Sequence, residues 1–296
     1  MTCTADLHMH SCYSTDGEKS PGELVALSSR AGMDWIAVAD HNRVDAVAEA
    51  LRAGEAAGVR VIPAVELDCM FRGRELHVLA YHIDHTDPRY AAIWTDLAEQ
   101  EIAASRRRME LVAGCGFLFD FDAVLAQAQD GIVTNELIAE FLLADPRNDD
   151  NEQLAPYRPG GTRSDNPYVN FYWDFCSHGK PDHVAIAYMT IEEGIRLIRD
   201  TGGAPVLAHP GQSLRNNLQD FPDVVRTGIC GVEAYSSYHS PADCAYWADR
   251  ARENNLLITC GSDYHGKTKP AIAIGGHGCP LDGEEMVAAL RAAATA

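Results

Sequence analysis

Side chains that can bind a metal ion gather near the start of this chain. Asp6, His8, His10 and Asp16 all lie within its first 16 residues. Because successive side chains of an extended strand alternate between its two faces, His8 and His10 would point the same way and could hold one ion. The pair therefore predicts a metal site, provided that other parts of the chain supply further ligands.

Seven short apolar runs predict the strands that would position such ligands. They cover residues 2–10, 34–42, 59–68, 74–83, 203–211, 231–237 and 256–266. Most of the runs contain a polar or ionisable residue near the C-terminal end and are followed by a loop and a helical pattern. This alternation predicts a parallel sheet or barrel, in which the C-terminal ends of the strands share one side and build the active site.

The polar residues at these strand ends form one set of candidate metal ligands, which Asp16 can join from the loop after the first run. The set is His8, His10, Asp40, His41, Glu66, His77, His209, Asp263 and His265. A lone buried histidine is more often a hydrogen-bonded core residue, but six of the twelve histidines at equivalent positions favour ligation. Imidazole and carboxylate together suit Zn, Mn or Fe, and ten positions predict two or three divalent ions.

Helix signals surround these runs. Ser20 with Glu23, and Thr190 with Glu193, each form a capping box that predicts a helix start. Further helices are expected over 44–57 and 283–294. Between about 88 and 180 the alternation stops: helical patterns cover 88–114, 121–129 and 135–144, and a loop rich in Pro, Gly and aromatic residues follows. We expect residues 1–87 and 181–296 to form the metal-binding barrel, and residues 88–180 an inserted, mainly helical subdomain that covers the active site.

Composition limits the possible partners. With 46% hydrophobic residues the chain can bury a core, and 24 basic against 43 acidic residues give a net charge of -19, which disfavours long nucleic acid and allows a small anionic substrate. There is no signal-like start or membrane-length apolar run, and the nine cysteines form no Cys-x-x-Cys pair, so we expect a cytoplasmic protein. Apolar helix faces could pack on the barrel or on a neighbouring subunit, which leaves the oligomeric state open.

The motifs "DLHMHSCYSTDG", "IAVADHN", "VIPAVELD", "ELHVLAY", "VLAHPG" and "GSDYHG" resemble, in this order, those of the PHP (polymerase and histidinol phosphatase) family. The resemblance covers residues 5–85 and 200–270. It implies a distorted (βα)7 TIM-like barrel and a metal-dependent phosphoesterase. In such an enzyme divalent ions activate water and neutralise phosphoryl oxygens. This disfavours a covalent alternative through Cys12, which would need a base partner.

The resemblance also implies individual ligand sets. One metal would be held by His8, His10, Glu66 and Asp263; a second by Glu66, His77 and His209; and a third by Asp16, His41 and His265. Asp40 and Asp6 are expected to orient imidazoles. The predicted catalytic residues are Asp263, together with His265 or His209 as the group that protonates the leaving oxygen.

Substrate contacts are expected from the insertion and from residues that follow the motifs. The candidate phosphate-binding residues are Lys19, Arg43, Arg158, Arg163 and Lys180. Relatives that cleave nucleoside bisphosphates often carry an Arg-x-His-like element where this chain has Asn135 and Leu137. The best-supported hypothesis is hydrolysis of phosphoribosyl 1,2-cyclic phosphate to ribose 5-phosphate and phosphate. The alternatives are a nucleoside 3',5'-bisphosphate 3'-phosphatase or 5'-to-3' exoribonuclease, and a metal-binding accessory module without catalysis.

Overall fold

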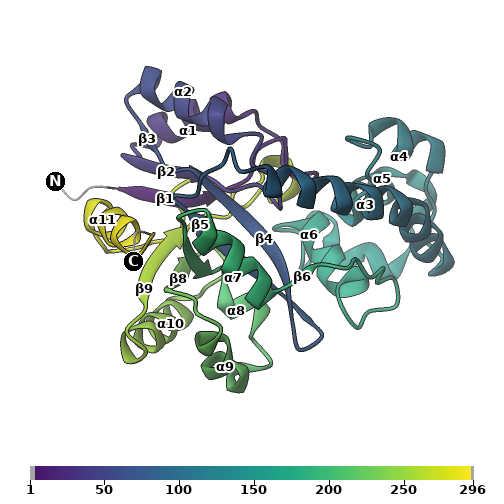
Figure 1. The fold of residues 1–296 in the computed structure, drawn as a ribbon. Helices are drawn as coiled ribbons and strands as arrows, with labels where there is room; N and C mark the ends of the chain where they lie inside the picture. The colour runs from purple at the N-terminus through teal and green to yellow at the C-terminus, as the bar shows by residue number, and fades with distance from the viewer. Residues whose placement is uncertain (1–3, 295–296) are drawn as a thin grey trace.

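The computed structural model describes residues 4–294, which form an α/β protein with two sheets at its centre (Figure 1). The smaller sheet has the order β1-β2-β3 and the larger β6-β4-β5-β7-β8-β9. The strands are β1 Ala5–Met9, β2 Trp35–Val38, β3 Arg60–Val61, β4 Ala64–Phe71, β5 Arg74–Tyr81, β6 Met189–Thr190, β7 Ala204–Leu207, β8 Gly231–Ser236 and β9 Leu257–Gly261. The predicted α/β fold is thus confirmed, and each expected run contains a strand in its described residues.

Most neighbouring strands are parallel, as expected, but β5 is an exception. It runs antiparallel to both β4 and β7. The physical reason is the connection: β4 and β5 are joined by a tight turn in which Arg72 and Gly73 have φ values of 51° and 76°. A two-residue turn can link only antiparallel strands, because a parallel pair needs a crossover of a dozen or more residues.

Within residues 4–294 the two sheets are not joined by a continuous ladder of strand pairs into one barrel. At the junctions only isolated bridges pair Met9 with Tyr264 and His41 with Glu66. These bridges bring together the loops after β1, β2 and β9 and the start of β4. The TIM-like arrangement of the strands therefore holds without a continuous ring of strand pairing, and the junctions are where the candidate ligands meet.

Helices cover the sheets on several sides (Figure 1). They are α1 Pro21–Arg30, α2 Val47–Ala57, α3 Pro88–Gly114, α4 Phe121–Gln127, α5 Asn135–Ala144, α6 Pro167–Phe171, α7 Ile191–Asp200, α8 Pro210–Ser213, α9 Phe221–Arg226, α10 Pro241–Glu253 and α11 Gly283–Ala294. Short helical turns are η1 Pro146–Asn148, η2 Glu152–Tyr157, η3 Tyr172–Cys176, η4 Leu218–Asp220 and η5 Gly266–Thr268. Both predicted capping boxes are present, at Ser20 and Thr190, and α2 ends at the left-handed Gly58, φ 72°.

Helices α3 to α6 extend to one side of the sheets (Figure 1) and have an apolar cluster of their own. Met109, Phe117, Leu142 and Phe171 are among its fully buried members. The aromatic stretch expected to be a loop instead contains η2, α6 and η3, because its rings pack into this cluster. The separate cluster supports the predicted subdomain at 88–180, whose boundaries stay a prediction.

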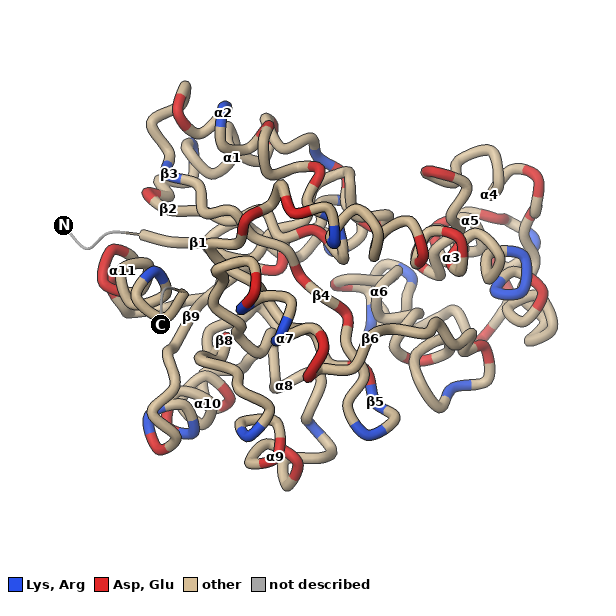
Figure 2. The backbone as a smooth tube through the Cα atoms, in the orientation of Figure 1, with Lys and Arg blue, Asp and Glu red and all other residues tan. Residues whose placement is uncertain are grey.

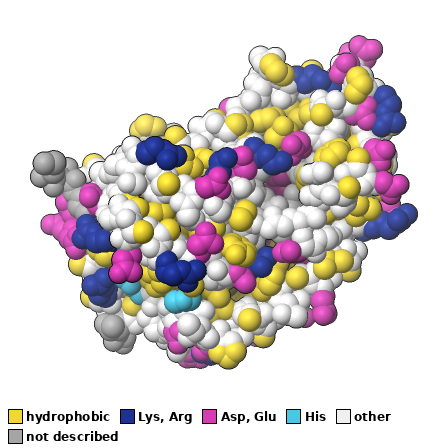
Figure 3. All heavy atoms as spheres, turned by 90° about the horizontal axis from the view of Figure 1, so that it is seen from above, with side chains coloured by type: hydrophobic (Ala, Val, Ile, Leu, Met, Phe, Trp, Pro, Cys, Tyr) yellow, Lys and Arg dark blue, Asp and Glu magenta, His cyan; other side chains and the backbone are white. Residues whose placement is uncertain are grey.

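Charged residues are spread along the whole chain, and Asp and Glu outnumber Lys and Arg (Figure 2). On the face shown in Figure 3, acidic, basic and hydrophobic side chains are interspersed. None of the helices within residues 4–294 combines the length and apolarity needed to cross a bilayer.

Candidate metal centre

One fully buried carboxylate, Glu66 on β4, lies at the centre of the predicted site. Its Oε2 atom lies 3.1 Å from Nε2 of both His8 and His10. Its Oε1 atom lies 3.0 Å from Nδ1 of His77 and 3.1 Å from Nε2 of His209. The two oxygens of Glu66 thus face two different pairs of histidines, which is the arrangement that a carboxylate bridging two ions requires.

The first predicted ligand set comes together. His8, His10, Glu66 and Asp263 each place a ligand atom within 4.8 Å of the others, and all four are buried. Asp263 Oδ1 lies 3.1 Å from Nε2 of His10. Within residues 4–294 neither this Oδ1 nor Glu66 Oε2 has a hydrogen-bond partner. Buried oxygens without partners are costly, so the donor set fits a divalent cation among them.

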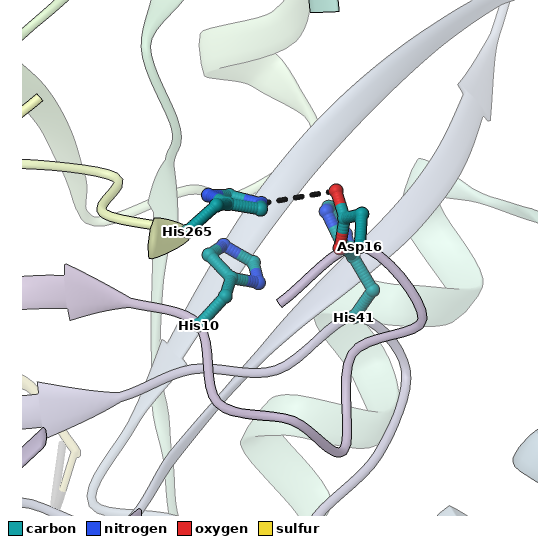
Figure 4. A group of neighbouring side chains, drawn as sticks. All are labelled: His10, Asp16, His41 and His265. Atoms are coloured by element: carbon teal, nitrogen blue, oxygen red, sulfur yellow. Dashed lines mark ion pairs between the residues drawn. The ribbon is translucent and has the colours of Figure 1, made fainter. Parts of the chain in front are cut away.

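A second group gathers around the loop after β1, where His10, Asp16, His41 and His265 point toward one another (Figure 4). Asp16 Oδ2 lies 3.1 Å from Nε2 of His265. The sequence predicted three of these residues as a set, and the structure adds His10, which lies between the two groups. Burial lowers the pKa of His265 to about 4, so its ring is neutral at pH 7, as a metal ligand must be.

His77 reaches the site by a route that strand order did not predict. It lies in the middle of β5, not at a strand end, and is the register partner of Asp68 on β4. Because β4 and β5 are antiparallel, its side chain lies on the same sheet face as Asp68 and close to Glu66. Its expected proximity to Glu66 and His209 is therefore seen, although the reason given for it, a parallel strand, was wrong.

Carboxylates and a hydroxyl hold the imidazoles in place. Glu233 on β8 lies with Oε1 2.9 Å from Nδ1 of His8, and its Oε2 accepts the backbone N–H of His209 at 2.8 Å. Ser14 Oγ lies 3.0 Å from Nδ1 of His10, and Asp40 in turn lies 3.1 Å from that hydroxyl. Asp40 thus lies where it could orient His10 through Ser14, and the expected orienting role stays a prediction.

Asp6 acts differently from the expectation. Its carboxylate accepts the backbone N–H groups of Ser262, at 2.9 Å, and Gly275, at 2.7 Å, and no hydrogen bond to an imidazole is found within residues 4–294. The reason is strand geometry. Asp6 and His8 share a face of β1, but Asp6 lies two residues earlier in the strand and so further from the cluster. It fixes the loop that carries Asp263 instead.

Asp68 is a site residue that the sequence did not indicate. Its Oδ1 lies 3.0 Å from Nδ1 of His41, and its Oδ2 accepts from the Asn42 amide at 2.7 Å. Burial opposes charge on His41, but Asp68 and Glu66 outweigh it and raise its pKa to about 10. Without metal the ring is therefore protonated at pH 7, and an ion bound to His41 would have to displace the Nε2 proton while Nδ1 stays on Asp68. The signal available in the sequence was its place in "VELD", two residues after Glu66.

Asp68→Asn is expected to weaken metal binding in the group of Figure 4. The amide can donate to His41 and so reverse the protonation of its ring, and changes at such orienting positions cost about 10–100-fold in metal affinity or activity. Metal content after dialysis and turnover at saturating metal are to be measured together. Metal content and turnover both within twofold of the wild type would contradict the orienting role.

The site opens into a cavity of about 550 Å³. On the sheet side its wall includes Glu66, His77, His209 and Asp263, and on the other side it includes residues from the inserted helices, which are Trp94, Leu97, Glu101, Arg108, Asn135, Glu136, Tyr172 and Trp173. Residues of the segment 88–180 thus line the same cavity as the candidate ligands, and its role as a cover of the site stays a prediction. A cavity of this volume suits a small molecule.

The five basic residues predicted to bind phosphate do not line this cavity. Lys19 bonds Glu18, Arg43 bonds Asp45 and Asp130, Arg158 lies 3.4 Å from Asp149, and Arg163 bonds Asp174, while Lys180 is exposed. The basic residues that do line it are Arg108 and Lys269. Cys12 also lies outside the cavity lining, and burial raises the pKa of its thiol, which does not favour a nucleophile.

The pKa of Glu136, on the cavity wall, predicts how the stability of the fold depends on pH. Burial and the nearby Asp16 raise its pKa from 4.5 to about 7. The native state therefore binds more protons than the unfolded state between pH 4.5 and 7, and stability falls as pH rises through this range. In metal-free protein, Glu136→Gln should raise the free energy of unfolding by about 1–3 kcal/mol at pH 8, and by less at pH 5. Urea unfolding at both pH values tests this, and an equal effect at both would contradict it.

Comparison with known proteins agrees with the geometry. Residues 6–140 match the PHP domain family. The chain is 28% identical over 264 residues to the phosphoribosyl 1,2-cyclic phosphate 1,2-diphosphodiesterase of Eggerthella lenta, covering 88% of this chain and 94% of the relative. It is 25% identical to the 3',5'-nucleoside bisphosphate phosphatase of Chromobacterium violaceum, covering 88% and 86%, and 28% identical to a 5'-3' exoribonuclease of Haemophilus influenzae, covering 90% and 91%.

Solved structures share the fold. An amidohydrolase from Chromobacterium violaceum, solved with sulfate and without metal, superposes with a TM-score of 0.77 at 23% identity and covers 97% of this chain and 96% of its own. A candidate metal-dependent phosphoesterase from Bifidobacterium adolescentis gives a TM-score of 0.78 at 23% identity, covering 98% and 96%. Residues 6–140 of the chain are thus similar to the PHP domain family, and the comparisons support a phosphoric ester hydrolase.

Proposed function

We propose that this protein hydrolyses the phosphate ester of a small phosphorylated sugar, with phosphoribosyl 1,2-cyclic phosphate as the substrate and ribose 5-phosphate and phosphate as products. The observation that carries the proposal is the position of Glu66, which lies between two pairs of histidines beside a cavity of about 550 Å³. Such a site can attack a cyclic diester and then the resulting monoester without changing its reacting groups.

Two or three divalent ions of Mn, Fe or Zn would be held by this chain. The sets are His8, His10, Glu66 and Asp263; Glu66, His77 and His209; and Asp16, His41 and His265 with His10. When bound, such ions activate water and neutralise charge on phosphoryl oxygens. The unpartnered Glu66 Oε2 and Asp263 Oδ1 support this assignment.

Proton transfer to the leaving oxygen is assigned to His209. A neutral His265, with a pKa of about 4, cannot supply a proton at pH 7. His209 lies at the cavity wall, with its ring 5.5 Å from that of Tyr238. Its Nε2 faces Glu66, and its Nδ1 is buried without a hydrogen-bond partner within residues 4–294. In the state in which Nε2 is protonated toward Glu66 and does not bind an ion, Nδ1–H is the group from which we expect a proton to be donated.

Two features of the cavity wall support a sugar. Asn135 Oδ1 and Trp173 Nε1 are buried polar atoms of lining residues that have no hydrogen-bond partner within residues 4–294. An acceptor and a donor of this kind suit ribose hydroxyl groups. The residues at the place of the Arg-x-His-like element, Asn135 and Leu137, carry no charge that would bind a second nucleotide phosphate.

A nucleotide substrate is the second candidate, because aromatic rings that could stack on a base also line the cavity. These are Trp94, Tyr172 and Trp173. Two relatives named for nucleoside bisphosphates or RNA support this alternative. A metal-binding accessory role without catalysis is less well supported, because it would not require a substrate-sized cavity beside the ligands.

The test is phosphate release by manganese-loaded protein from phosphoribosyl 1,2-cyclic phosphate and from adenosine 3',5'-bisphosphate at matched concentration. The proposal predicts a kcat/KM at least about tenfold higher for the cyclic ester, a difference of about 1.4 kcal/mol in transition-state stabilisation. A preference for the bisphosphate would contradict the sugar substrate and favour a nucleotide substrate. Turnover of neither substrate would contradict both assignments.

A further inference from the structure

Lys269 differs from every basic residue that the sequence singled out. Only 5% of its surface is exposed, yet it lines the cavity, just after the short η5 turn and six residues after Asp263. Burying a lysine ammonium is costly unless it is paired. The structure therefore pairs a buried ammonium group with a candidate metal ligand at the cavity wall, which indicates a role in the site.

The two oxygens of Asp263 are used differently. Oδ2 accepts a hydrogen bond from Lys269 Nζ at 2.6 Å. Oδ1 faces His8 and His10, at 3.4 and 3.1 Å, without a hydrogen bond within residues 4–294. Lys269 therefore leaves the metal-facing oxygen free, so its pairing with Asp263 is compatible with a bound ion.

The ammonium group has donors beyond this bond. A lysine has three N–H donors, and Asp263 accepts from one. Tyr238 lies on another side, with its ring centre 5.0 Å from Nζ. Because Lys269 lines the cavity, a remaining donor can reach a ligand there.

Charge in the cavity makes this cation important. The lining contains seven carboxylates, Asp16, Glu66, Asp68, Glu75, Glu101, Glu136 and Asp263, and two basic residues. Of these two, Arg108 is already paired with Glu101 at 2.5 Å and donates to the carbonyl of Val133 at 3.2 Å. Lys269 is thus the lining cation that adjoins the candidate ligands, and its charge adds to that which bound ions would supply.

We propose that Lys269 is a phosphate-binding residue, whose ammonium group donates a hydrogen bond to an oxygen of the phosphoryl group held at the metal centre. This rests on the proposed function and assigns the chain's own cation to the reacting phosphate. As a compact charge, the ammonium complements phosphoryl oxygens and stabilises them as the ester bond breaks.

The test is binding of inorganic phosphate to manganese-loaded protein, measured by titration calorimetry, which does not depend on turnover. Lys269→Met should raise the Kd for phosphate at least tenfold, with unchanged metal content. Lys269→Gln provides a second neutral variant, and Lys269→Arg should restore much of the affinity. The matched control is Lys267→Met, because Lys267 lies two residues earlier but is exposed and bonds Glu140.

A phosphate Kd within twofold of wild type in either neutral variant, at full metal content, would overturn the proposal. So would a loss of phosphate binding that excess manganese restores, since Lys269 would then act only by positioning Asp263. If wild-type protein binds phosphate through Lys269 but hydrolyses no ester, the proposed function fails while the binding role stands. If turnover is present and unaffected by Lys269→Met, the binding role of Lys269 fails while the proposed function stands.

Discussion

Glu66→Gln should lower kcat/KM by at least about 1000-fold, or roughly 4 kcal/mol of transition-state stabilisation. The substitution keeps the shape of the side chain but removes the charge that faces His8 and His10 on one side and His77 and His209 on the other. Because both oxygens of Glu66 are used, the change should also reduce the bound metal. Turnover and metal content are the measurements.

A matched control for this variant is Glu49→Gln on α2. Glu49 is partly buried and accepts the backbone N–H of Gly22 at 3.1 Å, outside the cavity lining. Its turnover should stay within about twofold of wild type. If Glu66→Gln retained turnover within tenfold of the control, the assignment of Glu66 as the shared ligand would be wrong.

Removal of metal should have the second large effect. Chelation should abolish turnover and also destabilise the fold, because buried carboxylates and imidazoles then face one another without a cation. At free metal about 1000-fold above its Kd, binding to the native state alone adds about 4 kcal/mol to the free energy of unfolding. Urea unfolding with and without manganese, and turnover after reloading, are the measurements.

The stability effect of the metal should depend on the ligands. In Glu66→Gln, manganese should add markedly less to the free energy of unfolding than in the wild type. A chelator-treated protein that kept both full turnover and full stability would contradict the metal centre altogether.

Much of the site could be predicted from sequence because its ligands follow strands. His8 lies in β1 and His10 directly follows that strand with the same facing, while Asp263 lies two residues after the end of β9. The helix starts at Ser20 and Thr190 were predictable because capping boxes are local. Local sequence patterns and the two-residue period of a strand thus predict the positions of most of the ligands.

Other features depend on contacts between distant segments. The antiparallel direction of β5 comes from the short turn at Arg72 and Gly73, and it places His77 in mid-strand beside Asp68. A run of apolar residues does not indicate strand direction. Asp68 and Lys269 likewise gain their roles only from side chains brought close by the fold.

The basic residues of the insertion also show that sequence alone does not indicate which side chains come together in the fold. Arg158 and Arg163 were attractive because they stand among aromatic residues, but each lies beside a carboxylate of the insertion itself, Asp149 and Asp174. In a chain with 43 acidic and 24 basic residues, a given arginine finds such a partner readily. Which cation faces the cavity was therefore not visible from composition or order.

The central claim, that the buried cluster around Glu66 hydrolyses phosphate esters, is tested most directly by one comparison. Phosphate release from a set of phosphorylated sugars and nucleotides is measured for manganese-loaded wild type, chelator-treated wild type and manganese-loaded Glu66→Gln. We predict release by the loaded wild type alone, fastest with the cyclic phosphoribose ester. No release from any substrate, or equal release by all three samples, would contradict the claim.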